Sequence, residues 1–298
     1  MNHSIDIAKG LGILAVIIGH IILDDHDGNY FRFVIYGFHM PLFFYVSGWL
    51  TNPGKLADLS FKGFLCKYGK RMLPWWFAAL VFYNLVVAFF THPDTSPAAI
   101  LNLIVEPFYH LWFIPGLFCT ILLYWLLTRY TSLSRTTAQW CLLALGTVTF
   151  VLALFEIIPT TFFIRRHNIL YFALGLLCKS YNKGLKANVL CLPLLFLICA
   201  SLIHFNITEY RGVYMQITVV TLFALLLNPI FHNDVLKPNR DLEWLGRNSL
   251  QIYLWHVAPI MALKQVLGSN STLYYCISFS ILLLSYLGLT VCLRRKKP

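Results

Sequence analysis

The chain has 298 residues, of which 58% are hydrophobic and 12% are charged. A soluble domain carries about twice that share of charged residues, and the mean hydropathy of +0.69 also argues against an ordinary soluble fold. The net charge of +11 does not require a nucleic-acid partner, because basic loops beside a membrane meet anionic lipid headgroups. We therefore expect an all-α integral membrane protein.

Cysteine usage argues against two common kinds of site. Most of the eight cysteines lie inside apolar runs, and no two of them form a CxxC pair. A disulfide framework or a zinc site would show regular cysteine or cysteine–histidine spacing. The GxSxG nucleophile elbow of many hydrolases is absent as well. We expect no bound metal.

Ten apolar runs are each close to the ~20 residues that cross the hydrocarbon core of a bilayer. They cover residues 7–23, 31–50, 73–90, 111–128, 138–158, 161–178, 188–205, 213–231, 248–267 and 272–293. Only short loops remain between them, so we expect one transmembrane domain over residues 1–298. The opening MNHSID lacks the basic region of a signal peptide, and the first run is expected to stay as a membrane helix.

The basic residues predict how these helices are oriented. If the N-terminus is cytoplasmic, most of the 23 Lys and Arg residues fall on the cytoplasmic side. The outward exceptions are Arg32, Arg165, Arg166, Arg211 and Lys264. This bias follows the positive-inside rule and predicts that both termini are cytoplasmic. Arg166, at the outer start of the sixth run, either anchors a helix end among the headgroups or binds an anionic group.

Three ionisable residues mark the first run, DIAKGLGILAVIIGH. At 100° per residue, Asp6, Lys9 and His20 share one helix face, with Lys9 and His20 about 16 Å apart along the axis. Ionisable groups are costly inside a membrane and suggest a functional site. His20, in the outer half, could take a proton from a hydroxyl or could only hydrogen-bond a neighbouring helix. Lys9 could hold a phosphate, and Asp6 is either its ion-pair partner or a helix-start charge that the helix dipole stabilises.

Small residues on a second face of this run would let another helix approach closely. They are Gly12, Ala15 and Gly19. The second run contains FHMPLFFYVSGWL, where Pro41 permits a kink beside His39 and a cavity could form. His39 could instead make an interhelical hydrogen bond, and Ser47 with Gly48 could serve helix packing rather than a site.

Two further segments carry candidate binding residues. The loop KYGKRMLPWW gathers Lys67, Lys70 and Arg71 at the inner surface, either as a positive-inside signal alone or as a landing site for a polyanion such as coenzyme A. The fourth run begins with HLWFIPG, where His110 and Trp112 lie near the expected level of the first-run histidine. Trp112 is either an interfacial belt residue or a stacking platform for a sugar.

The ninth run begins with GRNSLQIYLWH and carries a polar stripe. Ser249, Tyr253 and His256 follow one another at i, i+4 and i+7, so a continuous helix would turn all three toward protein or water. Asn248 is the expected N-cap. The histidines in the apolar runs do not have the spacing of a metal site.

Together these motifs resemble the membrane acyltransferase-3 family. DIAKG followed by His20, HMPLFFYVSGW, KYGKRMLPWW, HLWFIPG and GRNSLQIYLWH stand in the family's order, and the resemblance spans roughly residues 5–293. Lysine at the basic position of the first motif is similar to the branch called fucose 4-O-acetylase-like. Carried over, Lys9 and His20 occupy the family's basic–histidine pair. Ser47, Gly48, Arg71, Trp112, Ser249 and His256 also match by motif.

The resemblance implies a bacterial inner-membrane enzyme that O-acylates an extracytoplasmic carbohydrate. The acceptor would be a surface polysaccharide or a lipid-linked glycan. The acyl donor would be acetyl-CoA, with no permanently bound cofactor and with His20 as base or transient acyl carrier. Because the sequence ends at RRKKP, we expect the membrane part to bind both substrates alone or to pass acyl groups to a partner. The alternative is a transporter or flippase of a lipid-linked glycan.

Overall fold

Helices account for every regular element in the part of the chain that the structure describes. The computed structural model describes residues 2–22, 30–91, 110–154, 157–158, 168–180, 211–268 and 271–295. Within these ranges, five helices are long and apolar enough to cross a membrane: His3–Ile21, Phe31–Leu50, Phe113–Tyr130, Arg135–Ala153 and Thr272–Arg294. The all-α class is therefore confirmed for these ranges. The apolar run expected at 188–205 lies outside them.

The chain forms two compact units. The first combines Met1–Phe43 with Asn182–Pro298, and the second is Phe44–Tyr181. Helix α2, Tyr30–Leu50, supplies its first part to one unit and its second part to the other. The candidate residues of the two units are therefore considered separately.

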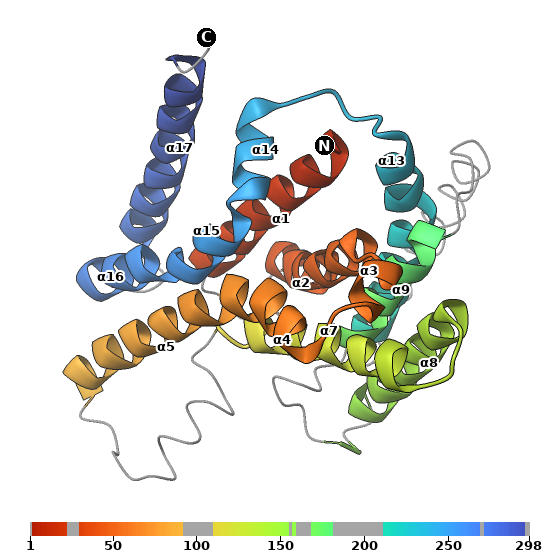
Figure 1. The fold of residues 1–298 in the computed structure, drawn as a ribbon. Coiled ribbons are helices and arrows are strands. Elements are labelled where there is room, and N and C mark those ends of the chain that lie inside the picture. Colours follow the sequence, from red (N-terminus) through yellow and green to blue (C-terminus); the bar gives the residue numbers. More distant parts are fainter. Residues whose placement is uncertain are drawn as a thin grey trace. The chain divides into compact units, whose positions relative to one another are not determined.

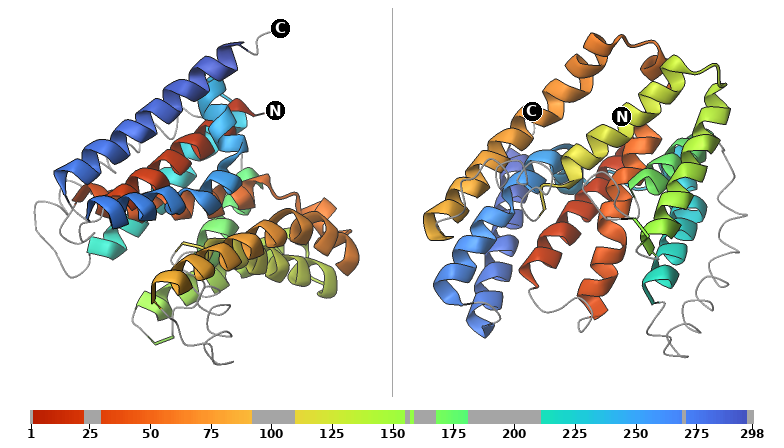
Figure 2. Two further views of the ribbon diagram at one scale, coloured as in Figure 1. Left: turned by 90° about the vertical axis from the view of Figure 1, so that its left-hand side faces the viewer. Right: turned by 90° about the horizontal axis from the view of Figure 1, so that it is seen from below.

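Helix α1 is the central element of the first unit. Besides the first part of α2, the described helices of this unit are α1 (His3–Ile21), α12 (Arg211–Leu222), the π turn η2 (Phe223–Leu227), α13 (Asn228–Asn233), α14 (Arg240–Arg247), α15 (Ser249–Trp255), α16 (Val257–Leu267) and α17 (Thr272–Arg295). Helix α1 packs against α13, α14, α15, α16 and α17 (Figures 1 and 2). One N-terminal helix is thus enclosed by helices from the far end of the sequence.

Two glycines of α1 allow α2 to approach closely. A Cβ added at Gly12 would lie 2.9 Å from Leu42 Cδ2, and one added at Gly19 would lie 3.0 Å from both Ile35 Cγ2 and Tyr36 Cε2. Side chains of α2 therefore occupy the space that larger residues of α1 would need. At Gly12 and Gly19, the prediction of a small-residue packing face is confirmed.

Helix α14, which the sequence did not predict, makes close backbone contact with α1. Its N-terminus is capped by Asn239, whose side-chain oxygen accepts a hydrogen bond from the N–H of Leu242. A Cβ added at Gly10 of α1 would overlap the backbone of Leu242, and one added at Gly246 of α14 would overlap the backbone of Asp6. A glycine on each helix lets the two backbones meet.

The ninth predicted run is two helices rather than one. Helix α15 ends at Trp255 and α16 starts after His256. Pro259 has no N–H to bond the carbonyl four residues earlier, which is a physical reason for the break at this point. The prediction of one unbroken helix over this run is therefore wrong, although His256 keeps right-handed helical dihedral angles and its N–H donates to the carbonyl of Ile252 at 2.9 Å. Asn248 precedes α15 but makes no side-chain cap, because its amide donates to the carbonyl of Trp244 at 2.8 Å.

The second unit joins the end of α2 to helices from the middle of the sequence. These are α3 (Pro53–Ala57), α4 (Phe61–Phe64), the π turn η1 (Leu65–Gly69), α5 (Lys70–Thr91), α7 (Phe113–Tyr130), α8 (Arg135–Leu154) and α9 (Asn168–Ser180). A Cβ added at Gly48 would overlap the backbone of Phe172, and one at Gly175 would overlap that of Tyr45. This geometry favours the helix-packing interpretation of Gly48.

The contact between α1 and α14 predicts that a glycine-to-alanine substitution lowers stability at Gly246 but not at Gly288, which lies outside this contact. Gly246→Ala adds a Cβ that overlaps the backbone of Asp6, so we expect a loss of about 1–3 kcal/mol, typical of overpacking, seen as a lower Tm in detergent. The control is Gly288→Ala in α17, whose new Cβ would have no atom within 4 Å. That Tm should stay equal or rise slightly, because alanine is the better helix former. Equal Tm values for the two variants would contradict the proposed backbone contact.

Candidate active site

Five aromatic side chains form a connected ring cluster in the first unit: His20, Tyr36, His39, Tyr253 and His256. His20, in the last turn of α1, is 9% exposed. Its ring centroid lies 5.0 Å from that of His256 and 6.0 Å from that of Tyr36. The ring of His39 lies edge-on to Tyr36 at 5.0 Å, and Tyr253 lies 6.0 Å from His256. The structure thus brings together candidate residues from the first, second and ninth predicted runs.

Backbone carbonyls determine the tautomers of two of these histidines. His39 Nδ1 lies 2.6 Å from the carbonyl oxygen of Ile35. His256 Nδ1 lies 2.8 Å from the carbonyl oxygen of Tyr253 and 3.2 Å from that of Ile252. A carbonyl only accepts, so each Nδ1 carries the proton and donates it, and each neutral ring has its lone pair on Nε2. The Nδ1 bond of His39 stays within α2 and is not interhelical.

Arg32 approaches the phenol of Tyr36 in two ways. The guanidinium carbon lies 4.9 Å from the ring centroid, a cation–π geometry, and Nη2 lies 3.4 Å from the phenol oxygen. That oxygen also lies 3.4 Å from Nδ1 of His20. Neither residue was among the site candidates predicted from the sequence. The available signal was their i, i+4 spacing on one helix face.

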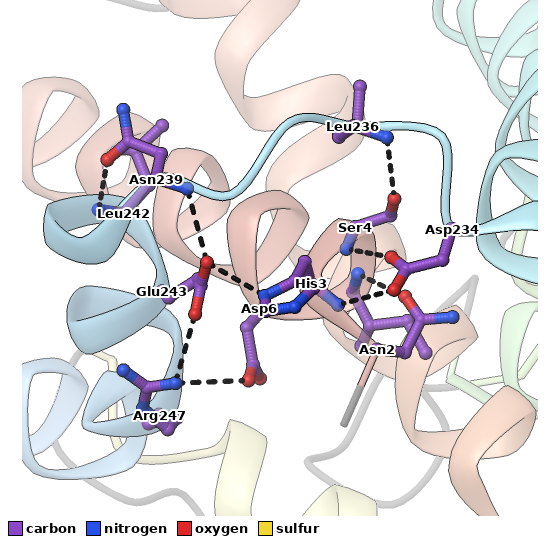
Figure 3. A network of polar contacts seen from close by, with 11 residues as sticks. Asn2, His3, Ser4, Asp6, Asp234, Leu236, Asn239, Leu242, Glu243 and Arg247 are labelled. Carbon is purple, nitrogen blue, oxygen red and sulfur yellow. Dashed lines mark hydrogen bonds and ion pairs between the residues drawn. The ribbon is translucent and has the colours of Figure 1, made fainter.

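A second group of polar contacts surrounds the first turns of α1 (Figure 3). Lys9 Nζ lies 2.7 Å from Asp6 Oδ1, and Arg247 Nη1 of α14 lies 3.8 Å from Asp6 Oδ2. Asp6 is 7% exposed. The expected pairing of Asp6 with Lys9 is present, and a second cation from another helix shares the same buried carboxylate.

Glu243 extends this network between α14 and the N-terminus (Figure 3). Its Oε1 lies 3.0 Å from His3 Nδ1 and accepts the N–H of Asn239 at 3.1 Å. Its Oε2 accepts from Arg247 Nη1 at 3.2 Å. Because Arg247 faces two carboxylates, opposite charges alternate across the contact between the helices. Compensation of this kind is needed where carboxylates are buried.

Asp234 binds the backbone of the first turn of α1 (Figure 3). Its Oδ1 accepts the N–H of Ser4 at 2.7 Å, and its Oδ2 accepts the N–H of His3 at 3.2 Å. These N–H groups have no partner within a helix. Burial alone would raise the pKa of Asp234, but the hydrogen bonds from Ser4 and His3 outweigh it and hold the pKa below its ordinary value of 3.8.

The basic residues of the loop form an exposed cluster in the second unit. Lys67, Lys70 and Arg71 are all exposed, on η1 and at the start of α5. Lys67 Nζ lies 5.3 Å from the ring centroid of Tyr68. Burial raises the pKa of Tyr68 above its ordinary value of 10.0, and the positive charge of Arg71 offsets part of that rise. An exposed patch of this charge can attract a polyanion.

His110 and Trp112 are buried in the second unit. His110 is 2% exposed and meets the ring of Tyr83 edge-on, with the centroids 5.0 Å apart. Trp112 is 8% exposed and stacks on Phe44 at 6.4 Å. The Trp112 ring is thus packed against protein rather than exposed as a belt residue would be.

The other candidate residues have less definite surroundings. Ser47 and Ser249 are half-buried, and the carbonyl of Ser47 accepts the hydroxyl of Thr51 at 2.8 Å. Arg166 lies outside the described residues.

The ring cluster suits proton transfer better than metal binding. No group of three or more His, Cys, Asp or Glu side chains in the described ranges is arranged to hold a metal ion. A neutral imidazole can take a proton near neutral pH. Phenol and imidazole neighbours can orient that ring by hydrogen bonding. The cluster therefore offers a base without any carboxylate among its members.

Comparison with known proteins agrees with a role in group transfer. A family model described as an acyltransferase domain, of the acyltransferase-3 type, matches residues 2–293. The chain is 32% identical over 139 residues to the nodulation protein NolL of Mesorhizobium japonicum. That alignment covers 44% of this chain and 37% of NolL, so the chain matches much less than two thirds of that relative. No solved structure matches the chain.

The contacts of Asp234 predict a stability loss that depends on pH. Asp234→Asn replaces one acceptor oxygen by an N–H donor facing the backbone of α1. Near neutral pH we expect a loss of about 1 kcal/mol, typical of a lost helix cap. Since the folded-state pKa is lowered, the carboxylate contributes fully above its unfolded pKa, and this contribution disappears as the pH falls through the folded pKa. The Tm difference between the two proteins should therefore shrink toward acidic pH, and a constant difference would count against this interpretation.

Proposed function

Because the chain belongs to the acyltransferase-3 family of integral membrane acyltransferases, we propose that it moves an acetyl or similar acyl group from acyl-CoA to a carbohydrate hydroxyl. The acceptor is a cell-surface polysaccharide or a lipid-linked glycan. Support for this acceptor comes from the first-helix motif, which is similar to that of the fucose 4-O-acetylase-like branch. The five apolar helices of spanning length in the described ranges fit a multi-pass enzyme.

The observation that carries the proposal is the buried imidazole of His20 beside Tyr36 and His256. His20 takes the proton of the acceptor hydroxyl at Nε2, while the acceptor oxygen attacks the carbonyl carbon of the thioester. As the tetrahedral intermediate collapses, the C–S bond breaks and the imidazolium gives its proton to the leaving sulfur. The products are the acyl ester and the CoA thiol, and His20 returns to its neutral form. In the other possible route, His20 first carries the acyl group.

The acyl donor is proposed to be acetyl-CoA, used as a substrate rather than a bound cofactor. Its phosphates are anionic, and two sets of basic residues fit such a ligand. One is Lys9 in the first unit, and the other is the exposed cluster of Lys67, Lys70 and Arg71 in the second unit. Lys9 is paired with Asp6 in the structure, which orients its ammonium group.

The carbohydrate is proposed to bind through the remaining polar and aromatic candidates. His39, Tyr253 and His256 belong to the ring cluster, and Ser249 begins the helix that carries Tyr253 and is followed directly by His256. Ser47, His110, Trp112 and Arg166 are proposed to support the acceptor side. Buried histidine and tyrosine side chains supply the donors and acceptors that sugar hydroxyls require.

We propose ten membrane spans in a single domain over residues 1–298, with both termini in the cytoplasm. A bacterial inner membrane is the proposed location. The basis is the distribution of basic residues along the sequence. This topology puts Lys9 near the cytoplasm and His20 in the outer half of the membrane, where an extracytoplasmic hydroxyl could reach it.

A reporter fusion tests this topology. A reporter attached after Pro298 should be active only in the form that reports the cytoplasm. A fusion in the loop between the first two spans should behave in the opposite way, and it serves as the matched control. Extracytoplasmic activity of the C-terminal fusion would overturn both the orientation and the depth proposed for His20.

The alternative function is a transporter or flippase of a lipid-linked glycan. Such a protein would use the same polar groups as a permeation path and would need no thioester chemistry. Transfer of label from acetyl-CoA by the purified protein separates the two functions. A transporter would move glycan without consuming acetyl-CoA.

Substitutions at the two ends of α1 test the proposed division of roles. His20→Asn and His20→Gln keep hydrogen-bonding ability but cannot take a proton near neutral pH. We expect both to bind acetyl-CoA normally and to lose acyl transfer by the ~10²–10⁴-fold that general-base catalysis supplies, or more. Lys9→Ala should instead weaken acetyl-CoA binding, and Lys9→Arg should keep part of it. Near wild-type turnover in a folded His20 variant would exclude the catalytic role.

A further inference from the structure

His20 differs from the other two histidines of the ring cluster in what its Nδ1 faces. His39 and His256 each direct Nδ1–H to a backbone carbonyl, whereas His20 Nδ1 faces the phenol oxygen of Tyr36 at 3.4 Å. A carbonyl allows one tautomer, but a phenol can donate or accept. In this contact, each role of Tyr36 corresponds to a different tautomer of His20.

Only one of the two arrangements leaves His20 able to act as a base toward a substrate. If the phenol donates to Nδ1, the neutral ring carries its proton on Nε2 and has no lone pair to offer. If Nδ1–H donates to the phenol oxygen, the lone pair is on Nε2. The hydrogen bond at one ring nitrogen thus decides the chemistry at the other.

We propose that Tyr36 is a positioning residue that accepts the Nδ1–H of His20 and so keeps the Nε2 lone pair available for the acceptor hydroxyl. This inference rests on the proposed function, because it assigns how the proposed base is prepared. This role requires no contact between Tyr36 and the substrate or the transferred proton. Its oxygen acts only through the imidazole.

The packing around Tyr36 holds its phenol oxygen in place beside His20. The Tyr36 ring sits against Gly19 of α1, where a Cβ would come within 3.0 Å of Cε2. Arg32 lies over the ring at 4.9 Å, and the ring of His39 lies at 73° to that of Tyr36 with the centroids 5.0 Å apart. With contacts on several sides, the ring has little freedom to turn its hydroxyl away from His20.

Arg32 also limits what the phenol oxygen can do. Its Nη2 donates to that oxygen at 3.4 Å and places a positive charge near the cluster. When His20 takes a proton, its Nδ1–H bond to the phenol becomes charge-assisted and stronger.

The first test measures the tautomer directly, in the wild-type protein without substrate. Nitrogen NMR of the full chain with isotope-labelled histidine distinguishes Nδ1–H from Nε2–H, and the His20 signals are those missing from His20→Asn. We expect Nδ1–H for His20 in the wild type and a shift toward Nε2–H in Tyr36→Phe. An Nε2–H ring in the wild type, or an unchanged tautomer in Tyr36→Phe, would overturn the proposal. The wild-type measurement does not depend on any variant's activity.

The second test compares Tyr36→Phe with Tyr274→Phe, each of which removes one phenol hydroxyl next to α1. Tyr274, which is buried whereas Tyr36 is half-buried, donates its hydroxyl to the carbonyl of Ile21 at 3.2 Å and is not part of the ring cluster. With radiolabelled acetyl-CoA as probe and membranes of the source cells as acceptor, Tyr36→Phe should lower kcat about tenfold to a hundredfold. That loss is part of the ~10²–10⁴-fold that base catalysis supplies. Acetyl-CoA affinity should not change, and Tyr274→Phe should keep its kcat.

The outcomes separate this inference from the proposed function. Full transfer by His20→Asn would remove the catalytic role of His20, and with it the need for a positioning residue. Loss of transfer in His20→Asn together with normal kcat in Tyr36→Phe would reject Tyr36 alone. Equal losses in Tyr36→Phe and Tyr274→Phe would show a general packing effect and would also reject it.

Discussion

Burial of the Asp6 carboxylate is the constraint on which the rest of the first unit depends. An ionised carboxylate in a poorly hydrated site is costly unless cations compensate it. Lys9 lies on the same helix, but Arg247 comes from α14, so compensation requires the two helices to meet. Gly10 and Gly246 make that meeting possible, since any side chain at either position would hold the backbones apart. Close packing and charge pairing are therefore two aspects of one contact.

The fold was predictable where a local pattern decides it and unpredictable where a tertiary contact does. Apolar length identified α1, α2, α7, α8 and α17, and small residues identified the packing of Gly12 and Gly19 against α2. Helix α14 has a polar sequence of eight residues, too short to be recognised by apolar length. Its helical form depends on docking against α1. The boundary between α15 and α16 at His256 had a local signal in Pro259, which cannot donate a backbone hydrogen bond.

The residues of the candidate site were likewise predictable where a local pattern marks them and unpredictable where a tertiary contact does. Helical periodicity put Asp6, Lys9 and His20 on one face, and the structure joins His20 to His39 and His256, which the motifs had singled out separately. Tyr36 and Arg32 were missed because a tyrosine in an apolar run is typical of a core, and an arginine at its outer end is typical of a headgroup anchor. The contact of Tyr36 with His20 depends on the approach of α2 to α1 at Gly19, which no spacing within α2 alone could reveal.

The two ends of α1 differ in the kind of group they gather, and the difference fits the proposed reaction. Carboxylates and cations meet around Asp6 and Glu243, where they compensate one another, whereas the cluster around His20 consists of imidazoles and phenols. Acyl transfer from a thioester to a hydroxyl moves one proton and leaves no net charge on the catalyst, so a neutral base is sufficient for it. A permanent carboxylate beside His20 would favour a lasting imidazolium, which cannot accept a proton. Orientation by a neutral phenol avoids that outcome, because it directs the ring without holding it in the charged form.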